Sequence, residues 1–374
     1  MTDPAASGHE APLSTLEIHL DRIAWNYLFL KKRLSAGTDC SAVVKADAYG
    51  LGADKVAPAL HRQGCRHFFV GNADEGVALR QVLPDADSSI YILNGPWGAT
   101  AGDFAHHRLV PVLNSYADVQ FWMAAVAGKA PSPVVLHIDT GMNRLGFSAA
   151  DVAAMKNDAA AWQALDVRYV MSHLACADDP PHRKNQEQLD RFRDLTQALG
   201  RPLRFSLANS AGILLGSKYH YDLVRPGCAL YGINPLSFSD HNNFQGAVTL
   251  RARIVQVRDL APADTVGYGA TYTTKSRAKA ATISVGYADG YLRSLSDRGY
   301  VFIHGVKCPV IGRVSMDLIT ADVSQVTKPV QPGDWAEIIG THQPVDSVAR
   351  QAGTIGYEIL TALGTRYKKE YTGV

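Results

Sequence analysis

From residue 41 to about residue 225, short apolar runs alternate with longer amphipathic stretches. Each run is rich in Val, Ile, Leu or Phe and ends in a polar residue or a glycine. Strands that alternate with helices in this way pair in parallel through crossover units. Eight such units predict a closed (β/α)8 TIM-type barrel. The predicted strands are 41–45, 67–71, 89–93, 109–113, 134–139, 167–172, 203–207 and 222–225.

After about residue 236 the pattern changes to short alternating runs separated by turn residues. These runs predict a mainly β domain, with one helical stretch at 347–364. A polar, turn-rich linker is expected at 234–246. We therefore expect an α/β chain with three parts, which are a loose N-terminal tail at 1–14, the barrel at 15–238 and the mainly β domain at 239–374.

Composition supports two globular domains and gives little sign of a charged partner. The chain has 374 residues, of which 47% are hydrophobic and 19% are charged, and this length exceeds one ordinary domain. Its 37 basic and 35 acidic residues give a net charge of +2. This small net charge does not indicate binding to nucleic acid or to an acidic membrane. The basic run at 366–369 is short, is followed by Glu370, and is interpreted as a solvated chain end.

The cysteines indicate a reducing compartment. Their number is odd, and none lies in a CxxC pair, which argues against a disulfide framework and a structural zinc site. The first fourteen residues lack the apolar core of a secretory signal, and no apolar run approaches membrane-spanning length. A cytoplasmic location is expected. The five cysteines are Cys40, Cys65, Cys176, Cys228 and Cys308.

Polar residues lie at or just past the carboxyl end of each predicted strand. In a barrel of this kind that end carries the active site. A helix N-cap is the structural alternative, and it is the role expected for Asn72 and Asn114. Basic side chains are poor caps, so another role is expected for four residues, Lys45, Arg144, His173 and Arg225. The strand-end residues are Lys45, Asn72, Asn94, Asn114, Asp139, His173, Asn209 and Arg225.

Lys45 is the strongest candidate for chemistry. It follows the apolar residues 42–44 and precedes a turn of small residues. At the dry end of a strand the ammonium loses hydration, so the pKa of the lysine falls. A neutral amine can attack an aldehyde, which makes Lys45 a candidate Schiff-base lysine. The alternative is a lysine that caps the strand and extends into water.

Two segments of small residues suit a phosphate group. They are ANSAG at 208–212, after the seventh predicted strand, and RPGCALYG at 225–232, after the eighth. Barrels often bind phosphate at these two loops, where backbone N–H groups can approach an anion. A reactive lysine with a phosphate site suggests pyridoxal 5'-phosphate, which needs an amine for its aldehyde, an anchor for its phosphate and a partner for its ring nitrogen.

Taken together and in order, the motifs from residue 16 to about 366 strongly resemble the alanine racemase family. The resemblance implies a pyridoxal-phosphate barrel followed by a β domain, paired head to tail as a homodimer. It implies a small amino-acid substrate, with no nucleic acid or membrane as partner. The motifs are AVVKADAYGLG around Lys45, DTGMNRLGF at 139–147, SHLACAD at 172–178, ANSAG, VRPGCALYG, VGYGATY at 266–272, SVGYADG at 284–290 and GRVSMD at 312–317.

The resemblance also implies roles for individual residues. Lys45 would hold the cofactor and act as one base, and Tyr268 would be the opposite base, supplied to the partner's site. Racemisation removes a proton from one face of Cα and returns one to the other, so it needs two such groups. Arg225 would face the ring nitrogen and keep it unprotonated, and His173 would link Tyr268 to Arg225. The other cofactor-binding positions are Tyr49, Asn209, Ser210, Gly227, Cys228 and Tyr357, and the substrate-binding positions are Arg144, Tyr287 and Met316, the last also from the partner.

One position departs from the family pattern. Many members carry a lysine, modified by carbon dioxide to a carbamate, two residues before the Asp-Thr-Gly-Met motif, and His137 stands there instead. The anionic partner expected for Arg144 is then missing, or replaced by chloride or another carboxylate. No resident metal is expected, although His137, Asp139 and His173 could form part of a metal site in a barrel hydrolase. The sequence is also compatible with a racemase for serine or another amino acid, a related decarboxylase and a non-enzymatic pyridoxal-phosphate carrier, and the role in wall synthesis or alanine catabolism stays open.

Overall fold

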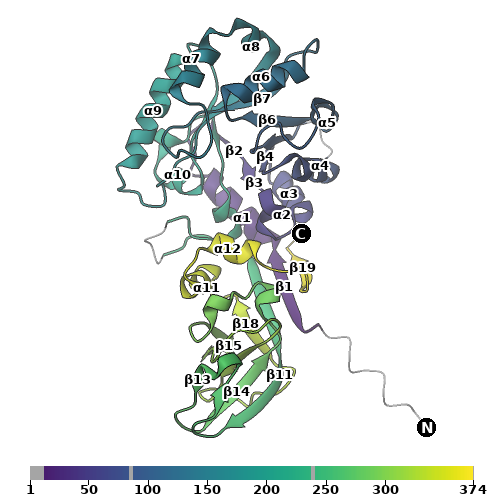
Figure 1. Ribbon diagram of the computed structural model, residues 1–374, viewed down its shortest axis with the longest axis vertical. Helices are drawn as coiled ribbons and strands as arrows, with labels where there is room; N and C mark the ends of the chain where they lie inside the picture. Colours follow the sequence, from purple (N-terminus) through teal and green to yellow (C-terminus); the bar gives the residue numbers. More distant parts are fainter. Residues whose placement is uncertain (1–11, 84–86, 237–240, 374) are drawn as a thin grey trace, which may run out of the picture. The chain divides into compact units, whose positions relative to one another are not determined.

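The computed structural model describes residues 12–83, 87–236 and 241–373 and divides them into two compact units (Figure 1). The barrel unit is Arg22–Gln245. The β unit combines the described residues up to Asp21 with those from Gly246 onward. Within the described ranges, no helix has both the length and the apolar character needed to cross a membrane.

The barrel unit is built on short parallel strands. Seven of them form one sheet in chain order, from β3 to β9, and an eighth, β10, pairs in parallel with β2. Most are buried on both faces, which explains their continuous apolar runs. The strands are β2 (Asp39–Cys40), β3 (Ala42–Val43), β4 (His67–Val70), β5 (Ser89–Ile92), β6 (Leu109–Leu113), β7 (Ser132–His137), β8 (Leu165–Met171), β9 (Phe205–Ser206) and β10 (Leu223–Val224).

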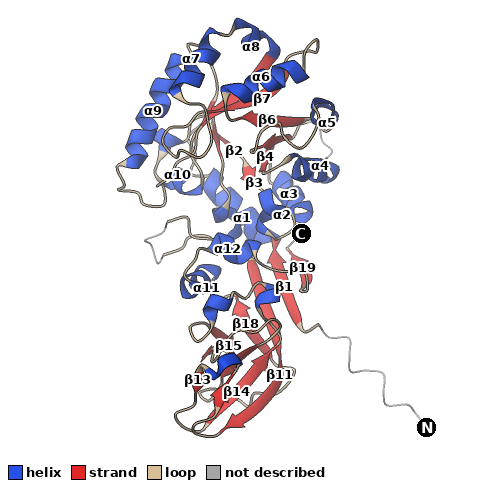
Figure 2. Ribbon diagram, viewed as in Figure 1, coloured by secondary structure: helices blue, strands red, loops and turns tan. Residues whose placement is uncertain are grey.

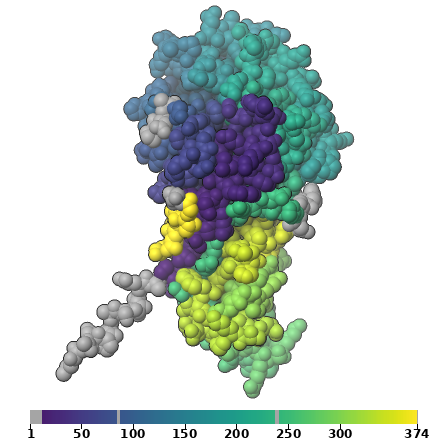
Figure 3. Space-filling model, turned by 180° about the vertical axis from the view of Figure 1, so that it is seen from behind, coloured from purple at the N-terminus to yellow at the C-terminus, as the bar shows by residue number. Residues whose placement is uncertain are grey.

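Backbone hydrogen bonds close these strands into a ring. The Ser41 N–H donates to the Val224 carbonyl at 3.0 Å, which ties the first barrel strand to the last. The Arg225 N–H donates to the Ala208 carbonyl at 2.8 Å, which ties the last strand to the segment after β9. Figure 3 shows the start of this unit, in purple, beside its teal end. The predicted (β/α)8 barrel followed by a mainly β part is confirmed.

Helices alternate with the barrel strands and lie outside them (Figure 2). Several begin at residues whose side chains accept a hydrogen bond from the first turn, such as Asn72, Ser115 and Ser148. Such caps satisfy N–H groups that the helix leaves unpaired. The helices are α1 (Leu20–Lys31), α2 (Lys45–Tyr49), α3 (Ala53–Arg62), α4 (Ala73–Val82), α5 (Ala101–His106), α6 (Tyr116–Ala125), α7 (Ala149–Asn157), α8 (Ala159–Ala164), α9 (Lys184–Ala198) and α10 (Ser210–Leu214), with 3-10 turns η1 (Ser217–Tyr219) and η2 (Cys228–Tyr231).

The β unit contains a sheet in the order β16-β15-β18-β11-β1-β19, with β14 pairing both β11 and β17. The alternation of 248–260 appears as the single long strand β11, and the late helical stretch appears as two helices. The elements are β1 (Ser14–His19), β11 (Val248–Leu260), β12 (Thr265–Val266), β13 (Tyr272–Thr273), β14 (Ala278–Ile283), β15 (Tyr300–Ile303), β16 (Val306–Pro309), β17 (Ile319–Asp322), β18 (Trp335–Ile339), β19 (Lys368–Thr372), α11 (Val345–Ala352), α12 (Gly356–Thr361), η3 (Tyr268–Ala270), η4 (Tyr287–Asp289) and η5 (Arg293–Leu295).

The start of the chain differs from the predicted boundaries. Ser14–His19 was expected to fall at the join of tail and barrel, but it forms β1 of the β unit, antiparallel to β11 and parallel to β19. Its alternating buried positions fill a sheet that β11 and β19 would otherwise leave open. Residues 1–11 of the predicted tail lie outside the described residues, as do residues 237–240 of the predicted linker.

The basic run near the C-terminus is not a solvated end. Lys368–Thr372 forms β19 and pairs with β1. Arg366 binds Asp289 through two nitrogens at 2.7 and 2.8 Å and Asp317 through a third at 2.7 Å. The prediction failed because partners distant in sequence pair with the run, which local charge does not reveal.

Candidate active site

The first barrel strand ends in a left-handed turn that carries Lys45. Ala46, Asp47, Ala48 and Tyr49 have φ of 52°, 53°, 53° and 59°, so the short α2 is not a right-handed helix. This conformation costs about 1–2 kcal/mol per non-glycine residue. Backbone strain of this kind persists only where surrounding contacts enforce it, and it concentrates at functional sites.

Glu75 holds this turn in place. Its Oε1 accepts from the Ala46 N–H at 2.8 Å, and its Oε2 accepts from the Gly71 N–H at 2.7 Å. On the other side, Asp47 Oδ1 accepts from the Ala53 N–H at 2.7 Å. Sequence reasoning missed Glu75, whose signal was its place three residues after the N-cap Asn72, where capping-box acids occur.

The environment of Lys45 favours a neutral amine. The side chain keeps contact with solvent, yet the protein packed around its ammonium disfavours charge and lowers the pKa of Lys45. The positive charge of Arg144 adds to this shift, whereas the carboxylate of Glu75 opposes it. The direction agrees with the sequence prediction for a nucleophilic lysine.

Arg225 is a buried cation with only neutral partners. Its Nη1 donates to the Ser206 hydroxyl, and its Nη2 donates to the Ser172 carbonyl at 2.5 Å and the Leu207 carbonyl at 3.4 Å. Burial lowers the pKa of Arg225 to about 10. Among the described residues no carboxylate pairs with it. A buried charge without a counter-charge is costly, so this geometry points to an anionic or electron-rich partner from outside the chain.

His137 is a buried neutral imidazole with an assigned tautomer. Asn114 donates through Nδ2 to the Leu93 and Val112 carbonyls at 3.1 and 3.2 Å, so its Oδ1 faces His137 Nδ1 at 2.8 Å. Nδ1 therefore carries the proton, and Nε2 remains an acceptor. Burial, helped by the charge of Arg225, lowers the pKa of His137 to about 4. The N-cap role predicted for Asn114 is wrong, because Ser115 caps α6.

His173 lies in the same basic group. Burial, followed by the charges of Arg225 and Arg144, holds the pKa of His173 well below its usual range. Its carbonyl accepts from Gln188 Nε2 at 2.9 Å, which fixes the loop after β8. A neutral imidazole can accept or donate a hydrogen bond without adding another positive charge to this end of the barrel.

A cradle of small groups follows β9 and β10. The N–H groups of Gly227 and Ala229 donate to the Ser210 hydroxyl at 2.9 and 3.4 Å. A Cβ atom on Gly227 would lie 2.5 Å from the Tyr49 hydroxyl oxygen, so a larger residue there would displace the Tyr49 side chain. The structure thus gathers three of the predicted phosphate-binding residues in one place.

Two further predicted residues adjoin this cradle. Asn209 caps α10 by accepting from the Gly212 N–H at 2.9 Å, which is the structural alternative for an asparagine at a strand end. Cys228 begins η2 and is buried, close enough to Tyr49 for the two groups to influence each other's ionisation. Asn209 directly precedes Ser210 and Cys228 directly follows Gly227, so both residues adjoin the cradle.

Arg144 is exposed and, among the described residues, forms no ion pair with a carboxylate. Asp139, five residues earlier, uses its Oδ1 on the N–H groups of Gly141, Met142 and Asn143 at 2.9–3.0 Å. In the described ranges, no three His, Cys, Asp or Glu side chains come together as a metal site.

The β unit displays its predicted residues at the surface. Tyr268, Tyr287 and Met316 are 72%, 43% and 53% exposed in the single chain. The Tyr287 N–H donates to the Ser315 carbonyl at 3.1 Å, and the Ala288 N–H donates to the Met316 carbonyl at 3.0 Å. The turn with Tyr287 and the loop with Met316 are thus bonded together.

The remaining β-unit residues extend this picture. Tyr268 opens η3 and is separated by Gly267 from Val266, the last residue of β12. The Val266 side chain packs in a cluster with three other buried residues of this unit, Leu260, Ala280 and Ile311. Tyr357, half-buried on α12, also belongs to the β unit. The chain therefore brings Lys45 together with its barrel neighbours, and it carries Tyr268, Tyr287, Met316 and Tyr357 on the other unit.

These features define a class of two-part enzymes in which an α/β barrel carries a strained lysine turn after its first strand and a glycine cradle after its last, and a β unit completes the chain. Residues 18–235 match the alanine racemase N-terminal domain, and residues 247–371 match the alanine racemase C-terminal domain. The chain belongs to the alanine racemase family.

Individual relatives agree along the whole chain. It is 44% identical to the alanine racemase of Rhizobium meliloti over 373 residues, which cover 96% of this chain and 97% of that protein. The alanine racemase of Rhodospirillum rubrum is also 44% identical, over 370 residues that cover 98% of each chain.

Solved structures show the same architecture. The alanine racemase of Bartonella henselae, crystallised with covalently bound pyridoxal phosphate, superimposes with a TM-score of 0.92 at 38% identity, covering 97% of this chain and 100% of that one. The biosynthetic alanine racemase of Pseudomonas aeruginosa gives a TM-score of 0.89 at 33% identity, with the same coverage of the two chains.

Proposed function

We propose that the chain interconverts L-alanine and D-alanine with pyridoxal 5'-phosphate as cofactor. The observation that carries this proposal is the arrangement at the carboxyl end of the barrel. A lysine with a lowered pKa stands on a strained turn whose last residue, Tyr49, reaches the Gly227 cradle. The covalently bound pyridoxal phosphate of the Bartonella henselae relative supports the same cofactor here.

The residues present fit this cofactor. The Ser210 hydroxyl receives two backbone N–H groups and retains its own proton to donate to a phosphate oxygen. Tyr49 lies over the same cradle, and Tyr357 is proposed as a further phosphate contact. The guanidinium of Arg225, which no carboxylate of the described residues neutralises, suits an electron-rich ring nitrogen. Lys45 supplies the amine for the aldehyde.

The chemistry needs two groups that exchange protons at opposite faces of Cα. Bound pyridoxal phosphate would withdraw electrons from the substrate and make its Cα proton acidic. Lys45 is proposed to exchange the proton on one face, and the phenol of Tyr268 is proposed to do so on the other. Arg144 is exposed and cationic, so it is suited to the substrate carboxylate. Tyr287 and Met316 are proposed to limit access to the site.

Tyr268 is proposed to act in the site of a second copy of the chain, in a head-to-tail homodimer. Its exposed position in the single chain supports this assignment. Closed dimers exchange such contributions reciprocally, so each dimer would hold two composite sites. A cytoplasmic enzyme that supplies D-alanine for the cell wall, or that serves alanine catabolism, is the proposed biological setting.

The cofactor and the reaction are tested together. Protein supplied with pyridoxal phosphate and then reduced with borohydride should carry the label on the peptide with Lys45, and Lys45→Ala should not be labelled. The exposed Lys55, which pairs with Asp54, is the matched control, because Lys55→Ala should be labelled normally. Incubation with a panel of L-amino acids in deuterated water should then give deuterated D-alanine, by chiral analysis.

Three results would redirect the proposal. Preferred conversion of serine or another amino acid would change the substrate but keep the reaction. Labelling of Lys45 without racemisation of any amino acid would indicate a carrier of the cofactor. Stoichiometric zinc in the purified protein, with no labelling of Lys45, would instead support a metal-dependent hydrolase.

A further inference from the structure

A cavity lies at the amino end of the barrel strands, away from the end that carries Lys45. Its volume is about 710 Å³, and its lining includes Arg108, Arg168, Arg204 and His67. His67 is the first residue of β4, and Arg108 and Arg204 directly precede β6 and β9. The cavity is therefore built from residues where strands begin, and the proposed catalytic chemistry uses none of them.

The cavity is lined by basic groups and by no carboxylate of the described residues. Two of the arginines already pair with carboxylates, and the Asp39 carboxylate also lies 3.9 Å from His67. Arg204 Nη2 donates to Asp39 at 3.0 Å, and Arg168 Nε contacts Asp166 at 2.7 Å, in ion pairs whose side chains are about half exposed. Each pair occupies one or two of the five N–H donors that a guanidinium carries. Both arginines thus stay oriented by their aspartates and keep donors for a further anion.

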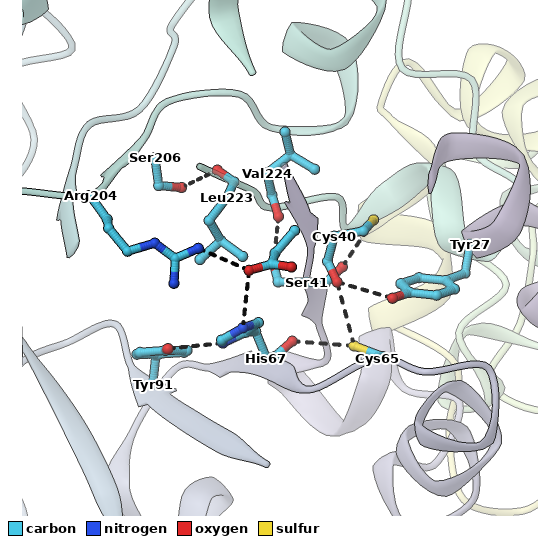
Figure 4. A network of polar contacts seen from close by, with 11 residues as sticks. Tyr27, Cys40, Ser41, Cys65, His67, Tyr91, Arg204, Ser206, Leu223 and Val224 are labelled. Atoms are coloured by element: carbon cyan, nitrogen blue, oxygen red, sulfur yellow. Dashed lines mark hydrogen bonds and ion pairs between the residues drawn. The ribbon is translucent and has the colours of Figure 1, made fainter. Parts of the chain in front are cut away.

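The wall of the cavity also holds aromatic hydroxyl groups. Figure 4 shows Arg204, His67 and Tyr91 beside one another, and the His67 ring lies 3.0 Å from the Tyr91 hydroxyl. Tyr169, 3% exposed, lines the same cavity, and its hydroxyl has no hydrogen-bond partner within normal geometry among the described residues. The Arg204 guanidinium lies over the Tyr169 ring, 4.8 Å from its centre. A buried donor without an acceptor is unfavourable, so an anion beside Arg204 would satisfy it after a small movement of that side chain.

Apolar side chains complete the lining, among them Val110, Val167 and Leu203. A cavity lined by both guanidinium groups and apolar side chains matches a molecule that has both a phosphoryl group and an organic part. Arginine is suited to such groups because its planar fork binds two oxygens at once.

We propose that the amino end of the barrel binds a small organic monophosphate, with its phosphoryl group between Arg168 and Arg204 and its organic part on the apolar wall. The site is separate from the cradle at Gly227. It depends on the barrel alone and not on the proposed reaction.

The test measures binding of phenyl phosphate and of inorganic phosphate by calorimetry. The protein first has pyridoxal phosphate fixed at Lys45 with borohydride and is then dialysed free of excess cofactor, so that the cradle is filled and the proposed site is empty. Saturable binding is expected for both, and phenyl phosphate should bind more tightly because of its ring. Arg168→Gln and Arg204→Gln should each weaken binding about tenfold or more, since each removes a charged hydrogen bond. Tyr169→Phe should weaken it by a smaller factor.

Arg193→Gln is the matched control, because Arg193 forms a similarly exposed ion pair with Asp190 on α9 and does not line the cavity. It should bind both probes as the wild type does. Circular dichroism should show that every variant is folded. If Arg204→Gln does not fold, the binding measured with Arg168→Gln still tests the proposal. Absence of saturable binding, or binding that both arginine variants leave unchanged, would overturn the proposal. Equal affinity for phenyl phosphate and inorganic phosphate would overturn the proposed contact with an organic group. The site would then bind only a free oxyanion.

Discussion

The barrel unit and the β unit hold their candidate residues in opposite ways. In the barrel, Arg225 and His137 are buried, and their partners Ser206 and Asn114 are buried with or beside them. In the β unit, Tyr268, Tyr287 and Met316 are exposed in the single chain. One unit contains a preorganised set of charges, and the other displays exposed side chains.

This difference separates two ways in which a fold prepares a site. Burial makes charge interactions strong, so the barrel residues alter one another's pKa values and work as a group. Exposed side chains gain no such effect until another surface covers them. Substitutions in the barrel should therefore alter pKa values and stability within one chain. Substitutions of the exposed β-unit residues should mainly alter the rate of the proposed racemisation.

The largest expected effect tests whether an exposed tyrosine is truly part of the chemistry. Tyr268→Phe should keep the labelling of Lys45 but lose racemisation by about 10²–10⁴-fold, the usual contribution of a positioned acid–base group. Chiral analysis in both directions measures this. Tyr300→Phe, in the hairpin of β15 and β16, is the control and should racemise normally. Near-normal turnover of Tyr268→Phe would remove this tyrosine as a base.

The second prediction concerns the buried imidazole of the barrel. His137 has a folded-state pKa of about 4, below the usual value of 6.5, so the unfolded chain binds more protons between these two pH values. Stability should therefore rise with pH across this window and fall as the solution is acidified from pH 6.5 towards pH 4. The free energy of unfolding of the wild type minus that of His137→Asn should grow by at most about 3 kcal/mol.

Urea unfolding of the cofactor-free protein at several pH values measures this difference. The exposed His106→Gln variant is the control and should follow the wild type across the window. A constant difference between wild type and His137→Asn would show that the imidazole is not held neutral by its surroundings.

A third prediction tests how the β unit fixes its displayed residues. Arg366 binds the buried Asp289, beside Tyr287, and the exposed Asp317, beside Met316. Arg366→Gln should lower stability more than any change at the exposed Asp317, because it leaves the buried Asp289 without its counter-charge. Asp317→Asn breaks only the exposed pair and should cost less than about 1 kcal/mol. Equal losses, measured by denaturant unfolding, would contradict this ranking.

The fourth prediction tests whether the barrel unit of one chain and the β unit of another form a shared active site. Lys45→Ala and Tyr268→Ala should each be inactive as homodimers. A mixed dimer places Lys45 of one chain with Tyr268 of the other at one of its two sites, so co-expression in equal amounts should restore about a quarter of wild-type sites. Verified mixed dimers without activity would mean that each site takes both residues from one chain.

The smallest expected effect is no change at all. The family resemblance led us to expect a carbamylated lysine where this chain has His137, and Arg144 has no carboxylate partner among the described residues. Activity should therefore be the same with and without bicarbonate, and a crystal structure grown with bromide in place of chloride should show an anion near Arg144. Dependence on bicarbonate, traced to a carbamate on another lysine, would show that this function had been misplaced.

Much of the architecture was predictable because the barrel strands are continuous apolar runs bounded by polar residues. Seven of the eight predicted strand segments overlap strands of one parallel sheet, and the eighth, at 222–225, overlaps β10, which closes the ring with β2. The alternation of 248–260 likewise appears as one strand. The place of Ser14–His19 was not predictable from its own pattern, since six alternating residues suit any half-buried strand and only pairing with β11 and β19 decides it.

The site divides in the same manner. Lys45, Ser210, Gly227 and Arg225 could be proposed from their positions after strands, and the structure gathers them at one end of the barrel. Glu75 and the pairing of Asn114 with His137 were not found, because each depends on which side chain faces which across 23 or more residues of chain. The assignment of Tyr268, Tyr287 and Met316 depends on the family resemblance and stays a prediction.

By itself the sequence determined the period of the strands and helices, the number of units and the type of residue at each strand end. These are local properties, fixed by how apolar side chains repeat and by what each residue can do chemically. The tertiary structure decided that β1 belongs to the β unit, that four residues after Lys45 adopt the left-handed conformation, and that Arg225 is buried against neutral groups. Such features arise from contacts between distant segments, where burial and neighbouring charge set the energy of a group far more than its own identity does.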